Sequence, residues 1–276
     1  MVTASLRSAL GMLRIPSLWL PGIASGLFSA SFVVLQFSSG AFIAERFWIL
    51  EMVVFPFFVA GLIHQVKTGE RTFSSFVTGG TTNYFRVLLP SLVIFSGLLL
   101  TMFLLLLPLA ILGLAETALV FVLLSASLTV LFFTFFYDTA AVIEERKVFD
   151  SVRRSVEFVL QQTRACLVFY LISLAIVCAI SFAILLAWTA SLYDRLEPLA
   201  AMGAAEVQSF SFDTFNAVLG TDGILVTALF AFIGATLVVS VIYSFKACFF
   251  RDYAGVPAAA VPVQGEFDEK GRWFKY

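Results

Sequence analysis

Charged side chains are scarce in this sequence. Only 13% of the 276 residues are Asp, Glu, Lys or Arg, whereas a soluble domain has about 25%. A soluble chain of this size could not hide its 61% of hydrophobic residues, because too much of the fold is surface. The scarcity of charge therefore excludes a wholly soluble fold. The sequence also has no basic tract, which excludes a nucleic-acid-binding surface.

Histidine and cysteine, the usual metal ligands, are almost absent. His64 is the one histidine, so it lacks a second imidazole for a zinc site. Cys166, Cys178 and Cys248 lie in apolar runs without CxxC spacing, which is typical of small buried residues rather than disulfide or metal partners. No phosphate-binding glycine loop, HExxH pair or GxSxG nucleophile turn is present. We therefore expect no cofactor, no bound metal and no enzymatic activity.

Long hydrophobic runs take the place of charge, and the mean hydropathy is +1.00. A helix needs about 20 mostly apolar residues to cross the hydrocarbon layer of a bilayer. Six stretches reach that length, so the sequence predicts an all-α, polytopic transmembrane helical bundle whose main partner is the lipid bilayer. The predicted spans are Pro16–Phe37, Phe47–Val66, Val87–Leu112, Thr117–Val142, Ala165–Ala190 and Gly223–Phe249.

The first span has one alternative interpretation, a cleaved signal peptide. It follows Arg7 and Arg14, and small residues at Ser29–Ser31 resemble a cleavage site. Its apolar run is longer than the 7–15 residues or so of a signal core. We therefore expect the first span to be retained.

Basic residues predict the orientation of the bundle. With the N-terminus inside, fifteen of the 17 Lys and Arg residues fall on the inner side, and only Arg46 and Arg195 fall outside. Positive charge is enriched in cytoplasmic segments. The sequence therefore predicts a multi-pass protein of the cell membrane with both termini in the cytoplasm.

Amphipathic segments precede several spans on the predicted inner side. Met1–Arg14 precedes the first span, and a weaker segment beginning at Phe73 precedes the third, where Gly79 and Gly80 interrupt it. We expect such segments to lie in the membrane interface. The strongest precedes the fifth span, and its apolar side chains repeat at helical spacing: Val148, Val152, Val156, Val159 and Leu160.

The chain divides into one six-helix membrane domain, residues 1–254, and a cytoplasmic tail, residues 255–276. The tail begins with a linker rich in Pro, Ala and Val, and Lys270-Gly271 favours a tight turn. Its aromatic end either docks on the bundle or a partner, or is disordered. The long acidic segment Ser191–Asp222 is either a cap or a binding surface on the outer side, and Leu196–Val207 within it favours a short helix.

Small residues and prolines indicate how the spans pack. Helices in lipid approach most closely where small residues repeat every four positions. Pro56 and Pro90 lie in or near spans and favour kinks, of which the one at Pro56 is structural or gates a path. We expect the small residues to make contacts within the chain rather than between copies: Gly22, Gly26, Ala175, Ala179, Ala183, Ala187 and Gly234.

Ionisable groups inside spans are costly in lipid and are the first place to look for function. Glu51 is either a proton or cation site or an interfacial carboxylate, and it pairs with Arg46 if the geometry allows. Asp138, Lys246 and His64 all fall near the inner ends of their spans. They form a polar cluster there, or they reach interfacial water independently.

One segment carries a family resemblance. Residues 135–155, FFYDTAAVIEERKVFDSVRRS, resemble a pattern in which a span ends in an acidic turn and an amphipathic helix of the VRRS type follows. Gly61–Arg86 is similar in layout. This pattern is typical of uncharacterised prokaryotic, especially archaeal-type, six-helix integral membrane proteins of unknown function. The resemblance implies six spans and a prokaryotic cell membrane, and it implies no site.

Two functions remain open from the sequence. The first is a non-enzymatic scaffold or accessory subunit of a membrane assembly, with a membrane protein partner or a second copy of the chain. The alternative is a transporter of a small molecule or lipid, which Glu51, Pro56 and the group Asp138, Lys246 and His64 motivate. No inverted repeat or pair of broken helices supports transport from the sequence.

Overall fold

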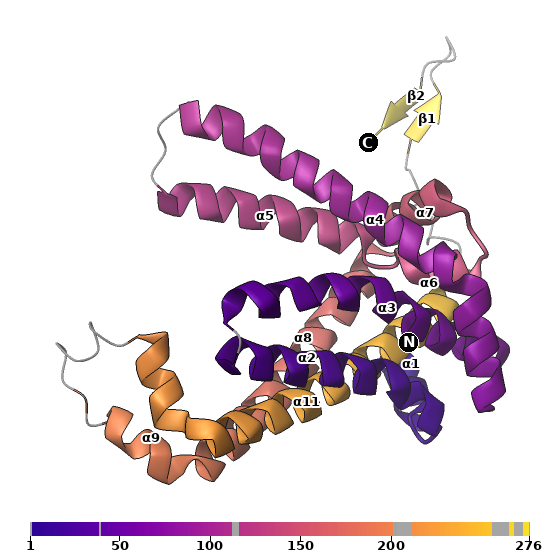
Figure 1. Cartoon of the computed structure of the whole chain (residues 1–276). Helices are drawn as coiled ribbons and strands as arrows, with labels where there is room; N and C mark the ends of the chain where they lie inside the picture. The colour runs from indigo at the N-terminus through magenta and orange to yellow at the C-terminus, as the bar shows by residue number, and fades with distance from the viewer. Residues whose placement is uncertain are drawn as a thin grey trace.

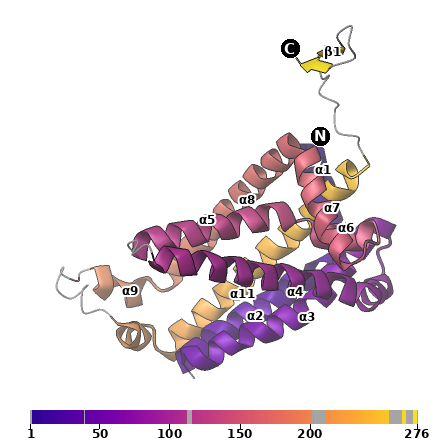
Figure 2. The same ribbon diagram turned by 90° about the horizontal axis from the view of Figure 1, so that it is seen from above.

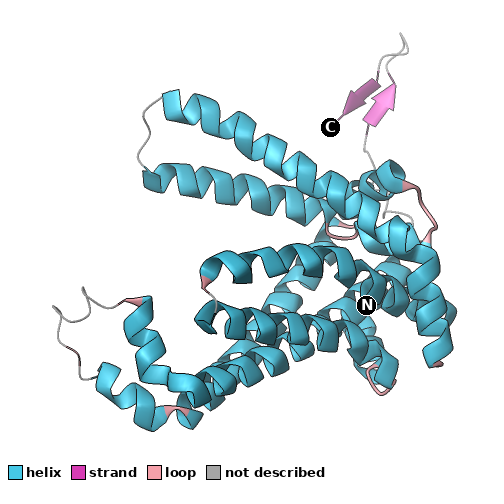
Figure 3. Ribbon diagram, in the orientation of Figure 1, coloured by secondary structure: helices cyan, strands magenta, loops and turns pink. Residues whose placement is uncertain are grey.

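Helices form almost all of the described chain (Figure 3). The computed structural model describes residues 2–38, 40–111, 116–200, 202, 211–255, 265–267 and 273–275. The helices are α1 (Val2–Met12), η1 (Pro16–Trp19), α2 (Leu20–Ser38), α3 (Ala41–Thr68), α4 (Phe73–Ile111), α5 (Glu116–Thr134), α6 (Tyr137–Ile143), α7 (Val148–Gln161), α8 (Thr163–Ser191), α9 (Tyr193–Ala200) and α11 (Phe212–Tyr253). Two short strands follow, β1 (Gly265–Phe267) and β2 (Trp273–Lys275).

Six helical segments of the described chain are long and apolar enough to cross a membrane. The predicted all-α fold is therefore confirmed, and the chain is a multi-pass membrane protein. The segments are Pro16–Ser38, Ala41–Thr68, Phe73–Leu109, Val120–Ile143, Thr163–Ser191 and Thr214–Tyr253.

The helices meet tightly at one end and diverge at the other (Figure 1). The core end contains α1, α6 and α7, and the far end contains the end of α2, the start of α3, the end of α4, the start of α5, and α9 with the start of α11. The long helix α11 runs between the two ends and packs along α2 and α8, with α1 across its core end. Figure 2 shows the same division from above. Beyond the contact between Trp48 of α3 and Phe95 of α4, the outer part of the α4–α5 hairpin diverges from α2 and α3 (Figure 1).

Buried apolar side chains gather at the core end. A group of phenylalanines from three helices and from the junction between α5 and α6 forms the centre, and each of its members is at most 1% exposed. Their rings meet with centroids about 5–6 Å apart, for example 5.0 Å between Phe136 and Phe158, within the range of favourable aromatic contacts. The group consists of Phe136, Phe158, Phe169, Phe245, Phe249 and Phe250.

The third span begins earlier than predicted. Gly79 and Gly80 do not interrupt an interfacial segment, because α4 runs without a break from Phe73 to Ile111. A Cβ atom at Gly79 would overlap the side chain of His64, and one at Gly80 would lie 2.7 Å from the ring of Phe57. The two glycines therefore let α4 pack closely against α3.

Local sequence explains several helix boundaries. Pro16 occupies the first position of η1, where its missing N–H costs no helical hydrogen bond. Gly69 ends α3 in the left-handed region, with φ of 74°, and its N–H donates to the carbonyl oxygen of Gln65 at 2.9 Å. Ser211 caps α11, and its hydroxyl accepts the N–H of Thr214 at 3.2 Å. These caps fix where the helices start and stop.

Pro56 and Pro90, the prolines from which kinks were predicted, lie inside helices. Pro56 is buried within α3, and Pro90 is buried within α4. Figure 1 shows α4 changing direction along its length, which a proline explains because it lacks a backbone donor. A gate at Pro56 stays a prediction.

The acidic segment before the last span is more helical than predicted. The predicted helix over Leu196–Val207 starts earlier, as α9 (Tyr193–Ala200); Met202 is not helical, and the rest of its later part lies outside the described residues. Helix α11 then begins at Phe212, eleven residues before the predicted span, and bends at Gly220, where φ is 61°. Arg195 of α9 holds this bend, because it donates to the carbonyl oxygen of Leu219 and pairs with Asp222 at 3.2 Å.

The tail contains an antiparallel pair of strands that the sequence did not predict. Glu266 of β1 lies opposite Phe274 of β2. The predicted turn at Lys270-Gly271 lies outside the described residues.

Candidate functional site

Asp138 and Lys246 form an enclosed ion pair at the core end. The Nζ atom of Lys246 lies 2.7 Å from the Oδ2 atom of Asp138, and the two side chains are only 3% and 2% exposed. Asp138 lies in the first turn of α6, and Lys246 lies in α11. The pair therefore joins two helices that are more than one hundred residues apart in the sequence.

Aromatic rings surround the ammonium group of Lys246. Its Nζ atom lies 4.2 Å from the ring centroid of Phe135, 4.9 Å from that of Tyr243 and 5.9 Å from that of Tyr137. Rings at these distances attract a cation through their negative faces. The second carboxylate oxygen of Asp138 accepts the N–H of Thr139 at 2.6 Å. Both charges thus have partners within the protein, as buried charges require.

The pair lies beside a break in the fourth span. The α5 helix ends at Thr134 and α6 begins at Tyr137, so Phe135 and Phe136 leave the helical path. Ser155 of α7 bridges the break, because its hydroxyl donates to the carbonyl oxygen of Phe133 at 2.8 Å and accepts the N–H of Phe136 at 3.0 Å. A side chain from another helix therefore satisfies the backbone groups that the break would leave unpaired.

His64 does not join this pair. Its side chain packs against Gly79 of α4, and no hydrogen bond or ion pair links it to Asp138 or Lys246 in the described part of the chain. The predicted polar cluster is therefore reduced to Asp138 and Lys246, and these two groups do not reach interfacial water.

Glu51 is half-buried in α3 and takes no part in the Asp138–Lys246 ion pair. The hydroxyl of Ser25 in α2 donates to its carboxylate at 3.2 Å. The predicted pairing with Arg46 is not formed, because the guanidinium of Arg46 lies 4.5 Å from the centroid of the Phe42 ring. Glu51 instead faces a groove that also contains Glu45 and Trp48.

The small residues of the first span lie at a close helix crossing. A Cβ atom at Gly22 would overlap the backbone of Thr236 and the hydroxyl of Ser240. A Cβ atom at Gly26 would lie 2.7 Å from the carbonyl oxygen of Phe232. The GxxxG spacing therefore brings α2 against α11 within the chain.

The alanine stripe of the fifth span, in contrast, lies on an exposed face of α8. Ala175, Ala179, Ala183 and Ala187 are all exposed, so they do not make the helix contacts within the chain that their spacing predicted. The neighbouring face of α8 packs on α11 instead, where Ile184 lies against Gly234 and Trp188 donates to the hydroxyl of Thr227 at 2.9 Å. Larger side chains make this contact because Gly234 leaves room for them.

Family comparison decides what kind of protein carries this arrangement. A family model described as a domain of unknown function, DUF7847, matches residues 1–253. The chain belongs to the DUF7847 family. The match ends where α11 ends, at Tyr253. No curated protein and no solved structure matches the chain. The prediction of a six-helix membrane family of unknown function is therefore confirmed.

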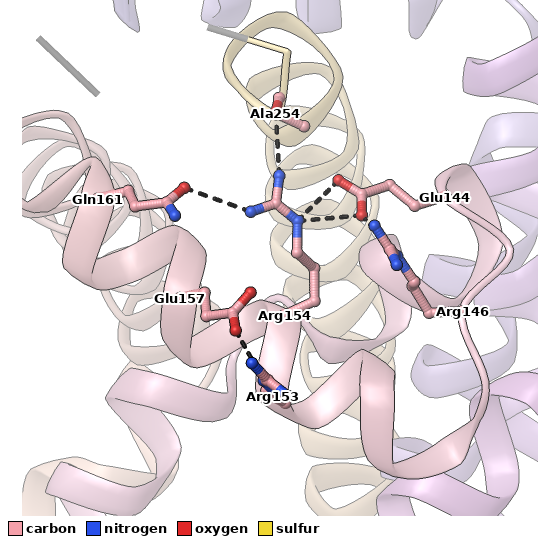
Figure 4. Close-up of polar contacts among 7 residues, drawn as sticks. All are labelled: Glu144, Arg146, Arg153, Arg154, Glu157, Gln161 and Ala254. Atoms are coloured by element: carbon pink, nitrogen blue, oxygen red, sulfur yellow. Dashed lines mark hydrogen bonds and ion pairs between the residues drawn. The ribbon is translucent and has the colours of Figure 1, made fainter. Parts of the chain in front are cut away.

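The DUF7847 chain holds its core end together with an arginine that sequence reasoning missed. The guanidinium of Arg154 in α7 donates to the carboxylate of Glu144 at 2.9 Å and to the carbonyl oxygen of Ala254 at 3.0 Å, and it also reaches Gln161 (Figure 4). It thereby ties α6, α7 and the end of α11 together. Glu144 and Arg154 both lie in the segment 135–155 that carries the family resemblance, but their sequence positions do not show that they meet.

Further basic side chains connect the end of α3 to this network. Lys67 lies 2.6 Å from the carboxylate of Glu145, which Arg86 also approaches, at 3.8 Å. The hydrogen bond from Lys67 and the two positive charges hold the pKa of the Glu145 carboxyl below its usual value. Arg251 of α11 donates to the carbonyl oxygen of Val66 at 3.3 Å.

Metal-ligating side chains are dispersed over the described part of the DUF7847 chain. No group of three His, Cys, Asp or Glu residues is close enough there to hold a metal ion. Cys166 and Cys248 are buried, Cys178 is exposed, and all three are free thiols.

Proposed function

We propose that this DUF7847 protein is a non-enzymatic scaffold or accessory subunit of a membrane assembly. It lies in the cell membrane with both termini in the cytoplasm. Support comes from how the ionisable side chains are used. Asp138, Glu144 and Glu145 each pair with a basic residue of another segment, so their charges hold helices together.

The observation that carries the proposal is the free surface of the α4–α5 hairpin. Large apolar side chains point outward along both of its helices, and Phe103 and Phe121 are 60% and 65% exposed. The hairpin stands on a packed base, because Phe132 of α5 and Phe136 beyond it contact the core phenylalanines and Tyr170. A fixed base and an uncovered surface leave room for another membrane protein to pack against these helices.

The distribution of basic residues supports the orientation. Arg7, Arg71 and Arg153 are exposed residues of segments at the core end, whereas Arg46 and Arg195 belong to segments near the far end. Positive residues favour the cytoplasmic side. The core end is therefore proposed as the cytoplasmic end, close to both chain termini.

Photo-crosslinking in the native membrane tests the scaffold proposal. A photoreactive residue is introduced at Leu100, Phe103 or Leu107 of α4, and the matched control positions are Leu225 and Leu229, which are equally exposed on α11. We expect one polypeptide, either a partner or a second copy, to be crosslinked from α4 in stoichiometric amount and not from the controls. Lipid adducts alone at all five positions would contradict the proposal.

Transport is a second candidate, and Glu51 favours it. Its carboxylate is half-buried in a groove rather than used in an ion pair. If the protein transports a solute, Glu51→Gln should change pH-dependent flux into liposomes, whereas Glu157→Gln in α7 should not. Flux that is the same in both variants would reject this candidate.

A further inference from the structure

A groove between α2, α3 and α11 combines negative charge with aromatic rings. Its volume is about 560 Å³. Its walls contain two carboxylates and four aromatic side chains, and the remaining residues are small or aliphatic. The groove is lined by Phe28, Ser29, Phe32, Val33, Glu45, Phe47, Trp48, Glu51 and Ala231.

Neither carboxylate is neutralised by a basic side chain of the described residues. Glu51 accepts one hydrogen bond, from Ser25, and Glu45 is exposed. Arg46 is the neighbouring basic residue, and its guanidinium lies over the ring of Phe42 instead. The groove is therefore complementary to a positive charge.

The aromatic walls are held in place by ring contacts. The centroids of Phe28 and Phe47 lie 5.3 Å apart, and Trp48 lies 5.6 Å from Phe95 of α4. Aromatic faces attract ammonium ions, with tryptophan the strongest, and cages of such rings bind quaternary ammonium groups. A hard metal ion is a poorer match, because calcium takes six to eight oxygen ligands and aromatic rings supply none.

We propose that this groove binds an organic ammonium ion that carries an apolar tail. The charge lies between Glu51 and Trp48, and the tail lies along apolar side chains. A second groove of about 390 Å³ between α2 and α3 shares Phe28 and Phe47 with the first and is lined by aliphatic residues such as Leu27 and Val54. Both grooves lie on helices that can span the membrane, so the ligand reaches them from the lipid phase. The site goes beyond the scaffold function and does not depend on it.

Radioligand binding tests the site in the intact protein. The protein is placed in lipid discs of phosphatidylglycerol, which lacks an ammonium group, and is titrated with tritiated dodecyltrimethylammonium. The comparison ligand is the neutral isostere, in which a tert-butyl group replaces the trimethylammonium group. We expect saturable binding of one cation per chain, at least about tenfold tighter than the isostere.

Variants test whether cation binding depends on the groove residues. Glu51→Gln and Trp48→Leu should each weaken cation binding by about tenfold. Glu157→Gln in α7 and Trp188→Leu at the contact of α8 and α11 should keep the wild-type affinity. Should Glu51→Gln fail to fold, Trp48→Leu and the exposed Glu45→Gln decide the result. Equal affinity for the cation and its isostere would overturn the proposal, as would wild-type affinity in the folded groove variants.

The lipid composition of the discs identifies the source of the ammonium group. If a phospholipid headgroup is the ligand, phosphatidylcholine in the discs should compete with the radioligand, and native mass spectrometry should retain one phosphatidylcholine per chain. If a free amphiphilic amine is the ligand, phosphatidylcholine should leave the affinity unchanged.

Discussion

The core end and the far end of this bundle differ in how far their apolar side chains are buried. At the core end, phenylalanines from three helices and the α5–α6 junction are buried together, and Asp138 and Glu144 pair with Lys246 and Arg154. At the far end, the α4–α5 hairpin exposes apolar residues such as Phe103 and Phe121 on its surface. The same apolar composition thus produces a packed base in one region and an open surface in the other.

The difference shows that hydrophobicity inserts these helices but does not assemble them. Lipid chains are as apolar as leucine, so apolar residues alone give helices no preference for one another. Close contacts form where the sequence supplies glycine, hydroxyl groups or paired charges. Gly22, Ser155 and Lys246 each lie at such a contact, and each offers a way to test the comparison.

The largest effect is expected from Lys246→Met. Removal of the ammonium leaves the carboxylate of Asp138 buried without its partner, which should cost about 3–5 kcal/mol of unfolding free energy. Denaturant unfolding in detergent measures the loss. Arg153→Ala, which breaks an exposed pair with Glu157, should cost less than about 1 kcal/mol.

A double variant sharpens this test. Asp138→Leu together with Lys246→Met removes both charges and should recover much of the stability that Lys246→Met loses, because no unpaired charge remains. If Lys246→Met alone were as stable as the wild type, the buried pair would not hold the core end together.

Gly22→Ala should have the next largest effect. The added methyl group overlaps the backbone of Thr236, so α2 and α11 must separate, at a cost of about 1–3 kcal/mol. Gly97→Ala in α4 is the matched control, because no atom lies within 4 Å of its new methyl group. Equal stability of the two variants, measured by thermal unfolding, would contradict the close crossing.

Ser155→Ala tests the break between α5 and α6. It leaves the N–H of Phe136 and the carbonyl oxygen of Phe133 without this partner, and should cost about 1–3 kcal/mol. Ser125→Ala is the control, because this exposed hydroxyl bonds only to its own helix at Phe121. A loss that is no larger for Ser155→Ala than for Ser125→Ala would show that α7 does not stabilise the break.

Acid should weaken the contact at Glu145 by a small amount. Because the pKa of this carboxyl is lower in the folded protein than in the unfolded chain, its stabilising effect is complete above the ordinary glutamate pKa of about 4.3. The effect falls as the pH drops below that value and is lost below the folded-state pKa. Glu145→Gln should therefore flatten the pH dependence of stability in this range, whereas an unchanged profile would speak against the pairing with Lys67.

The sequence predicted the spans but not the breaks within them. Hydropathy located six helices because apolar runs of sufficient length have few alternatives. The break at Phe135-Phe136 contains neither glycine nor proline, and the group that stabilises it, Ser155, lies on another helix. Conversely, Gly79-Gly80 suggested an interruption, yet α4 continues through it because the glycines face α3.

The spacing of small residues predicted one helix contact correctly and another wrongly. The spacing of Gly22 and Gly26 marks a contact because only glycine permits that approach of α2 and α11. The alanines around Ala179 have the same spacing but are exposed, since alanine fits a lipid-facing surface as well as a helix contact. The Asp138–Lys246 pair was foreseeable from charge and depth, whereas the exclusion of His64 from it required the three-dimensional fold.

A distance measurement between spin labels tests the division of the bundle most directly. One pair is placed at Phe103 in α4 and Ile43 in α3, both exposed near the far end, and a reference pair is placed at exposed positions of the core end, Arg7 and Arg153. In lipid discs, we predict a single narrow distance for the reference pair and a far-end separation well beyond the 8–10 Å or so between packed helices. A far-end distance that matches packed helices would contradict the account.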